Sequence, residues 1–282
     1  MLLIDRLYQK RDRERQEKEL IELLLRQSGS DVNDVACDAI YQLNQRGLLT
    51  GDTSLLQGAH LVHANLQHAR LTNVNLRNAV LTLADLSYAH LSGVELAGAL
   101  MSGTMLEHVE LADVDFSHTR LYHISLRGSK LSYLNLSGKE FQGSIFQDAR
   151  LNRINFSHSQ FDGWQASDFR HANLWEVDFS NADLTRTLFR KAELLEVNYE
   201  NANLCEADFR DAALSVINLK SANLVNASLE GVTRFKHIYC SEETILPDHT
   251  NWSPSTDMTR FTDPNHLDFW EPEWVKKERS NK

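Results

Sequence analysis

The stretch from Leu61 to Leu96 decides the fold, and it reads LVHAN LQHAR LTNVN LRNAV LTLAD LSYAH LSGVE L. A phrase of five residues is repeated here, and every phrase begins with leucine. The residue two places before each following leucine is alanine or valine. Because repetition at a fixed period is the strongest fold signal in a sequence, the period of five is interpreted before anything else.

The phrase continues through residues 56–229, with leucine, methionine, phenylalanine or tyrosine at its large apolar position. The phase is lost once, over residues 162–168, where two successive large apolar positions stand eight residues apart. An insertion of this kind makes a strand bulge and redirects its side chains. We therefore expect a local distortion at this place, with Trp164 or Ala166 in the inward position.

A period of five fits neither the 3.6-residue period of a helix nor the two-residue period of a strand. Two apolar residues separated by one position do, however, lie on the same side of an extended segment. The other three residues of each phrase must then turn a corner with polar side chains outward. The sequence therefore predicts a solenoid in which each coil is stabilised by its neighbours.

Residues 64–66 (ANL), 84–86 (ADL) and 172–174 (ANL) show the phrase in its most regular form, A-[ND]-L-x-x. In this form the sequence resembles the pentapeptide-repeat family. The resemblance implies an all-β solenoid, namely a right-handed quadrilateral parallel β-helix with four phrases in each coil. The number of phrases in this chain gives about nine coils, with an N-terminal α-helical extension before them and an irregular C-terminal tail after them.

Four segments are expected along the chain. Residues 1–27 read as a helix with apolar ends and a wholly polar middle, which either projects from the array or mediates self-association. Residues 28–55 contain a shorter capping helix and a linker, followed by the repeat array over 56–231. Residues 232–282, which hold all 4 prolines, form a capping tail or a partner-docking segment.

The composition is that of an ordinary soluble protein, with 42% hydrophobic and 24% charged residues and a formal net charge of -10. No apolar run is long enough to span a membrane, and the first residues lack the apolar core of a signal peptide. The 3 cysteines have no metal-like spacing, which favours a reducing compartment. We expect a cytoplasmic, bacterial protein.

Catalytic and metal sites need side chains that converge. In a coil of twenty residues, side chains twenty positions apart stack on one wall, about 4.8 Å apart. None of the 12 histidines stands twenty residues from another on the regular array, and no nucleophile triad or phosphate loop is found. The sequence therefore predicts no catalytic residue, no metal and no cofactor, and the chain is not expected to be an enzyme.

The lower part of the array contains the candidate partner-binding row, a set of basic residues with two apolar neighbours. Its members are Arg170, Arg190, Arg210, Lys191, Trp175 and Leu195. Three arginines at twenty-residue steps repel one another unless nearby negative charges neutralise them. Two sources of this negative charge stay open at this point, either the aspartates beside the row or a carboxylate-rich partner protein.

Two functions follow from the resemblance. The first is a non-catalytic scaffold or protein–protein interaction module, with an unidentified protein partner and no direct nucleic-acid binding. The alternative is a DNA-mimicking protein of the quinolone-resistance type, which binds gyrase or topoisomerase. B-DNA carries about one charge per 1.7 Å, whereas residues 164–231 contain six basic residues among eleven acidic ones, so the scaffold is preferred.

Overall fold

The structure is a computed structural model, and it describes residues 34–52 and 54–281, preceded by residues 11–12, 15–16, 18–19 and 22. These preceding positions are helical and exposed. The predicted helix over residues 1–27, and self-association through it, otherwise lie outside the described residues. Within the described part of the chain, no helix is both long and apolar enough to cross a bilayer.

The chain divides into two compact units. The first comprises residues 1–110 and 114–120, and the second comprises residues 111–113 and 121–282. In the first unit, parallel bridges join His60 to Val80 and Val80 to Leu100, each at a spacing of twenty residues. This spacing is the expected coil length.

Helix α2 (Asp34–Gln45) covers the first coils of the first unit. Ala39, Ile40 and Leu43 form its buried stripe. The Asn44 side-chain amide donates to the Thr72 carbonyl oxygen at 3.1 Å, which joins the helix to the array. The helix ends at Gln45, and the Gly47 amide donates back to the Asn44 carbonyl oxygen at 2.9 Å in the turn that follows.

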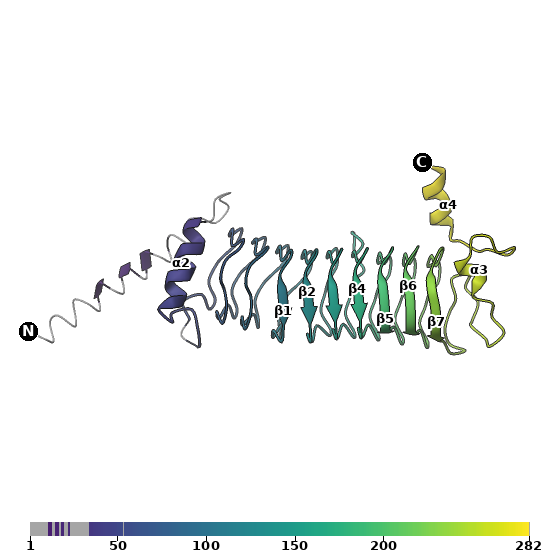
Figure 1. Cartoon of the computed structure of the whole chain (residues 1–282), viewed down its shortest axis with the longest axis horizontal. Coiled ribbons are helices and arrows are strands. Elements are labelled where there is room, and N and C mark those ends of the chain that lie inside the picture. Colours follow the sequence, from purple (N-terminus) through teal and green to yellow (C-terminus); the bar gives the residue numbers. More distant parts are fainter. Residues whose placement is uncertain are drawn as a thin grey trace, which may run out of the picture. The chain divides into compact units, whose positions relative to one another are not determined.

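A parallel sheet of seven strands, in sequence order, forms one wall of the coils (Figure 1). The strands are β1 (Glu110–Ala112), β2 (Lys130–Ser132), β3 (Arg150–Asn152), β4 (Asn173–Trp175), β5 (Glu193–Asn198), β6 (Ala213–Asn218) and β7 (Thr233–Tyr239). Leu131 pairs with Leu151, and Leu194 pairs with Leu214, so one coil takes twenty residues. The predicted β-solenoid is confirmed. The coil count differs modestly from nine, because the seven strands mark about six turns and the earlier coils carry single bridges instead of strands.

The turns explain why the phrase has five residues. After Leu86 the chain closes a β-turn, in which the Ala89 amide donates to the Leu86 carbonyl oxygen at 3.0 Å. The third residue of this turn, Tyr88, has a φ of 61°, in the left-handed region that such turns require. Asp85, just before Leu86, accepts the Ser87 amide through Oδ1 at 2.9 Å. Asparagine and aspartate recur at this position because their side chains close the turn.

The core of the second unit contains two columns of stacked aromatic rings. In one column the ring centroids of Phe146, Phe169, Phe189 and Phe209 follow one another at 4.5, 5.1 and 4.8 Å. In the other column Phe156, Phe179 and Tyr199 follow at 5.1 and 5.4 Å. Within each column, every ring after the first thus covers the ring one coil before it, as the repeat predicts.

Tyr199 is the exception in its column because it carries a hydroxyl into the core. The side chain is fully buried, and its oxygen has no hydrogen-bond partner among the described residues. Burial raises the pKa of this phenol well above its ordinary value. An unsatisfied buried hydroxyl destabilises the folded state.

Tyr199→Phe is therefore expected to raise the free energy of unfolding by about 1–2 kcal/mol. Urea unfolding followed by circular dichroism measures the change. The matched control is Phe189→Tyr, which adds a hydroxyl to a fully buried ring and is expected to destabilise. A phenylalanine variant no more stable than the parent would show that the hydroxyl is satisfied.

The lost phase is visible as a change of register. Across it, Leu151 pairs with Leu174, a spacing of twenty-three residues. The expectation that Trp164 or Ala166 points inward was wrong, since both are exposed and Ser167 is fully buried. Ser167 fits because its hydroxyl lies 2.8 and 2.9 Å from two backbone carbonyl oxygens, so a small polar residue takes the place of alanine.

The ladder continues beyond residue 231 into the C-terminal segment, because β7 pairs with β6. Ile245 then bridges Asn223. Leu246 and Phe261 are buried in this segment, whereas Leu267 is fully exposed. Two short helices complete it, α3 (Thr259–Thr262) and α4 (Glu273–Ser280).

Candidate functional site

The arginine row lies in the second unit, on the turns that precede β4, β5 and β6. Arg170, Arg190 and Arg210 each follow a fully or nearly buried phenylalanine, so the coil repeat sets their side chains in one line. The exposed fractions of the three side chains fall along the row, from 43% to 32% to 12%. Together with the exposed Lys191, the row lines a recess of about 380 Å³.

Aspartates neutralise part of the positive charge of the row. Asp168 binds Arg170 with a shortest distance of 2.7 Å from the guanidinium nitrogen Nη2 to the carboxylate. Asp208 lies between the other two arginines, and accepts Arg190 Nε at 2.6 Å and Arg210 Nη2 at 2.8 Å. Neighbouring aspartates thus neutralise the arginines in part, as one of the two alternatives expected. The most buried of these aspartates is Asp208, whose side chain is only 2% exposed.

A glutamate that the sequence did not point to completes the cluster. Glu278 of α4 accepts Arg190 Nη2 at 2.9 Å and Arg210 Nη2 at 2.7 Å. The two arginines therefore share two carboxylates, one from their own turns and one from the C-terminal helix. Charge-assisted hydrogen bonds of this kind are about twice as strong as neutral ones.

Helix α4 is attached to the coils at three further points. Trp274 donates through Nε1 to the Asn226 carbonyl oxygen at 2.8 Å, and its ring lies under the Arg210 guanidinium at 5.1 Å. Val275 is fully buried. Arg279 pairs with Glu271 at 2.8 Å and also contacts Glu230.

Burial sets the protonation of Asp208. Loss of hydration raises the pKa of its carboxyl to about 6, and the charges of Arg190 oppose the rise. Glu278, which is also negative, raises the pKa further. At neutral pH the cluster holds two guanidiniums against two carboxylates, and below pH 6 it acquires a net positive charge.

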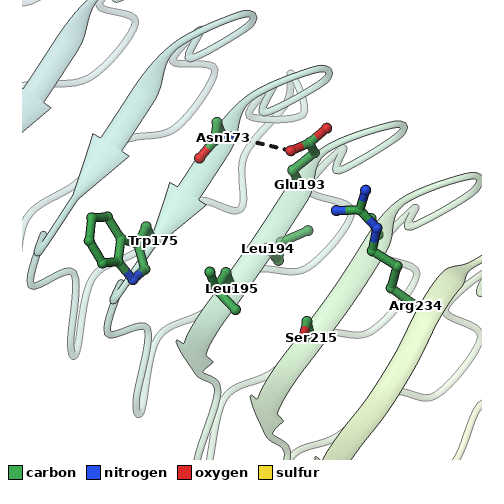
Figure 2. Close-up of a pocket in the computed structure, with 8 residues that line it drawn as sticks. Asn173, Trp175, Glu193, Leu194, Leu195, Ser215 and Arg234 are labelled. Carbon is green, nitrogen blue, oxygen red and sulfur yellow. Dashed lines mark hydrogen bonds between the residues drawn. The ribbon is translucent and has the colours of Figure 1, made fainter.

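The apolar pair lies on the strands and not on the turns. Trp175 of β4 and Leu195 of β5 are register partners, and each is 42% exposed. Figure 2 shows them side by side on the outer face of the sheet, with Ser215 on the next strand. Large exposed apolar side chains at adjacent positions on rigid strands are characteristic of protein-binding surfaces.

Charged side chains border this pair on one side. Glu193 accepts a hydrogen bond from the Asn173 amide at 3.5 Å, and the Arg234 guanidinium lies nearby on β7 (Figure 2). With Trp175 and Leu195 they line a shallow recess of about 280 Å³. We call this surface the Trp175 face.

The structure thus separates the predicted set into two groups. Arg190 and Arg210 meet through shared carboxylates, and Trp175 and Leu195 meet across β4 and β5. The signal for α4 was present in the sequence, because Trp274 and Glu278 stand one helical turn apart in a charged C-terminal segment. Among the described residues, no group of three His, Cys, Asp or Glu side chains is arranged to hold a metal ion.

A comparison with family models agrees with the coil geometry. The model described as Pentapeptide repeats matches 8 copies, which together span residues 54–157, 167–198 and 200–233. The chain belongs to the pentapeptide-repeat family. The gap in the match over residues 158–166 covers most of the register change, so the family pattern and the structure place the irregularity together.

Several solved structures are similar to this chain. HetL from the cyanobacterium Nostoc sp. strain PCC 7120, involved in heterocyst differentiation regulation, is 23% identical over 76% of this chain and 98% of its own, with a TM-score of 0.39. A variant of QnrB1, a plasmid-mediated fluoroquinolone resistance protein, is 19% identical over 63% and 86%, with a TM-score of 0.35. Rfr23 from the cyanobacterium Cyanothece 51142 is 22% identical over 56% and 91%, with a TM-score of 0.20. No curated protein matches the chain.

Proposed function

We propose that this pentapeptide-repeat chain is a non-catalytic scaffold that binds a partner protein through the Trp175 face. The observation that carries the proposal is the register pair of Trp175 and Leu195, both exposed on neighbouring strands. The equivalent outward positions on the two preceding strands, β2 and β3, are polar, namely Ser132 and Asn152. The apolar pair is therefore a departure from the pattern that keeps the rest of this wall in water.

The coil design supports a binding role. Inward residues are fixed by stacking, and outward residues stand on a rigid backbone with hydrogen bonds to both neighbouring coils. Such a surface binds without reorganising, which keeps the entropic cost of association low. Solenoids commonly offer extended surfaces of this kind to partners.

The partner that we propose is a protein segment with an apolar anchor and at least one carboxylate. The apolar anchor would cover Trp175 and Leu195. The carboxylate would face Arg234, on the same border of the recess, and Lys236, the register partner of Ser215. Aromatic residues and arginine are the side chains that most often dominate binding energy at interfaces.

The test compares two tryptophan variants of the full chain in quantitative affinity purification after crosslinking. Trp175→Ala is expected to lower the recovery of a specific partner by about tenfold. Trp164→Ala is the matched control, because Trp164 is fully exposed and lies on the irregular turn, away from the Trp175 face. Equal recovery of every partner by both variants would contradict the proposal.

A gyrase supercoiling assay with the purified chain tests the alternative function. The scaffold proposal expects no inhibition at micromolar protein. Inhibition that persists in the Trp175→Ala variant would favour DNA mimicry, because a mimic depends on its acidic surface and not on this tryptophan.

A further inference from the structure

The contact between α4 and the arginine row has the form of a ligand in a binding site. We propose that Arg170, Arg190, Arg210 and Lys191 form a receptor for an acidic helix of a partner protein, and that α4 occupies part of this receptor in the free chain. The inference rests on the proposed scaffold function and assigns it a second binding surface with a defined ligand chemistry.

The proposed receptor is preorganised by the coils. The backbone of the row is held by the coil ladder, since the Lys191 amide donates to the Arg210 carbonyl at 3.0 Å and the Asp208 amide to the Thr187 carbonyl at 3.0 Å. Asp208 then orients both guanidiniums through the contacts at 2.6 and 2.8 Å. Two oriented guanidiniums with one shared aspartate leave one positive charge, which is the requirement for binding another carboxylate.

The helix depends on the receptor, and the receptor does not depend on the helix. Helix α4 has only eight residues, whereas isolated helices below about 12–15 residues are marginal in water. Its grip on the coils comes from the side chains already described, chiefly Glu278, Trp274 and Val275. Such a short terminal helix can leave while the coils keep their hydrogen bonds.

Helix α4 also leaves part of the row uncovered. Arg170 remains 43% exposed, and Lys191 is exposed and forms no ion pair among the described residues. Asp211 and Glu230 line the opposite end of the recess and restrict the basic surface to the side of Arg170. A longer helix with more acidic residues gains contacts there that α4 does not make.

The spacing of the row selects a helix as the ligand. Successive arginines stand one coil apart, about 4.8 Å, and one turn of an α-helix rises about 5.4 Å. Glutamates at positions i, i+3 and i+7 along one helix face rise by about 4.5 and 6.0 Å, close to the step between successive arginines. An extended strand would place same-face residues about 6.6–6.8 Å apart, which does not match the row.

The experiment measures binding of a fluorescein-labelled, alanine-rich helical peptide with glutamate at i, i+3 and i+7, and of a matched peptide with glutamine at the same positions. Fluorescence anisotropy is recorded with the full chain and with its Glu278→Gln variant. Removal of the internal competitor is expected to tighten binding of the glutamate peptide about tenfold, with no gain for the glutamine peptide. Glu273→Gln is the control, since Glu273 lies on the same helix but pairs with Lys276.

A second substitution locates the binding. Adding Arg190→Gln to the Glu278→Gln variant is expected to reduce glutamate-peptide binding to the level of the glutamine peptide, with the β-solenoid circular-dichroism spectrum retained. Equal binding of the two peptides, or no tightening in Glu278→Gln, would overturn the inference. Loss of a partner by Trp175→Ala is measured separately, so the scaffold proposal stands or falls independently.

Discussion

Replacing Asp208 by alanine is expected to lower the free energy of unfolding by about 3 kcal/mol at pH 7. The substitution removes one of the two carboxylates that Arg190 and Arg210 share. Glu278 then remains as the carboxylate paired with both guanidiniums. The expected cost is at the low end for a broken buried pair, because Arg190 keeps 32% of its side chain exposed. The variant also loses the turn bond from the Arg210 amide to Asp208 Oδ1, at 3.2 Å.

The stability of the parent chain also depends on the protonation of Asp208. Burial raises the pKa of Asp208 from 3.8 to about 6, so between these values the folded chain binds a proton that the unfolded chain does not. The parent chain therefore gains stability from this group as the pH falls from 7 to below 3.8, by about 3 kcal/mol in all. The cost of Asp208→Ala should accordingly increase toward pH 4. Urea unfolding at several pH values measures it.

Substitution of the neighbouring Arg190 tests the direction of the change in the pKa of Asp208. Arg190 opposes the rise in the pKa of Asp208, so Arg190→Gln is expected to move the carboxyl titration of Asp208 to higher pH. Glu278 acts in the opposite direction, and Glu278→Gln should move the titration lower. Carboxyl carbon chemical shifts follow both changes. A titration of Asp208 below pH 4 in the parent chain would contradict the role assigned to burial.

The sequence was sufficient for the inward positions of the regular coils, because one spacing rule governs them. Leu86, Leu106 and Leu126 were expected to face inward from their spacing alone, and each is buried in the unit that contains it. The rule failed at the irregular turn, where Trp164 was a candidate for the interior and Ser167 was not. Ser167 nevertheless stands two places before Phe169, the position at which Ser144 and Ser159 are also fully buried, and its hydroxyl bonds backbone carbonyl oxygens.

The candidate site was harder to predict because its decisive contact is not local. The spacing of Arg190 and Arg210 follows from the repeat, but their pairing with Glu278 joins positions 88 and 68 residues apart. No period relates the C-terminal helix to the coils. The charges of the row could be counted from the sequence. Which carboxylate pairs with them could be known only from the fold of the C-terminal segment.

Phe169→Ala is expected to lower the free energy of unfolding by about 3–5 kcal/mol, the largest effect of any substitution considered for this chain. Phe169 is fully buried, and its ring stacks on Phe146 at 4.5 Å and on Phe189 at 5.1 Å. Alanine at this position leaves a cavity that the neighbouring coils cannot close, because their backbone hydrogen bonds fix the distance between them.

The contrast with Trp175 makes the prediction specific. Trp175→Ala removes an even larger side chain from the outer wall, only six residues after Phe169. It is expected to change stability by no more than about 0.5 kcal/mol. Thermal and urea unfolding of both variants decide the matter. Comparable losses from the two substitutions would mean that Trp175 stabilises the coils, and its exposure could then no longer be explained by a partner. A large loss at Phe169 with none at Trp175 separates what holds the solenoid together from what it offers to other proteins.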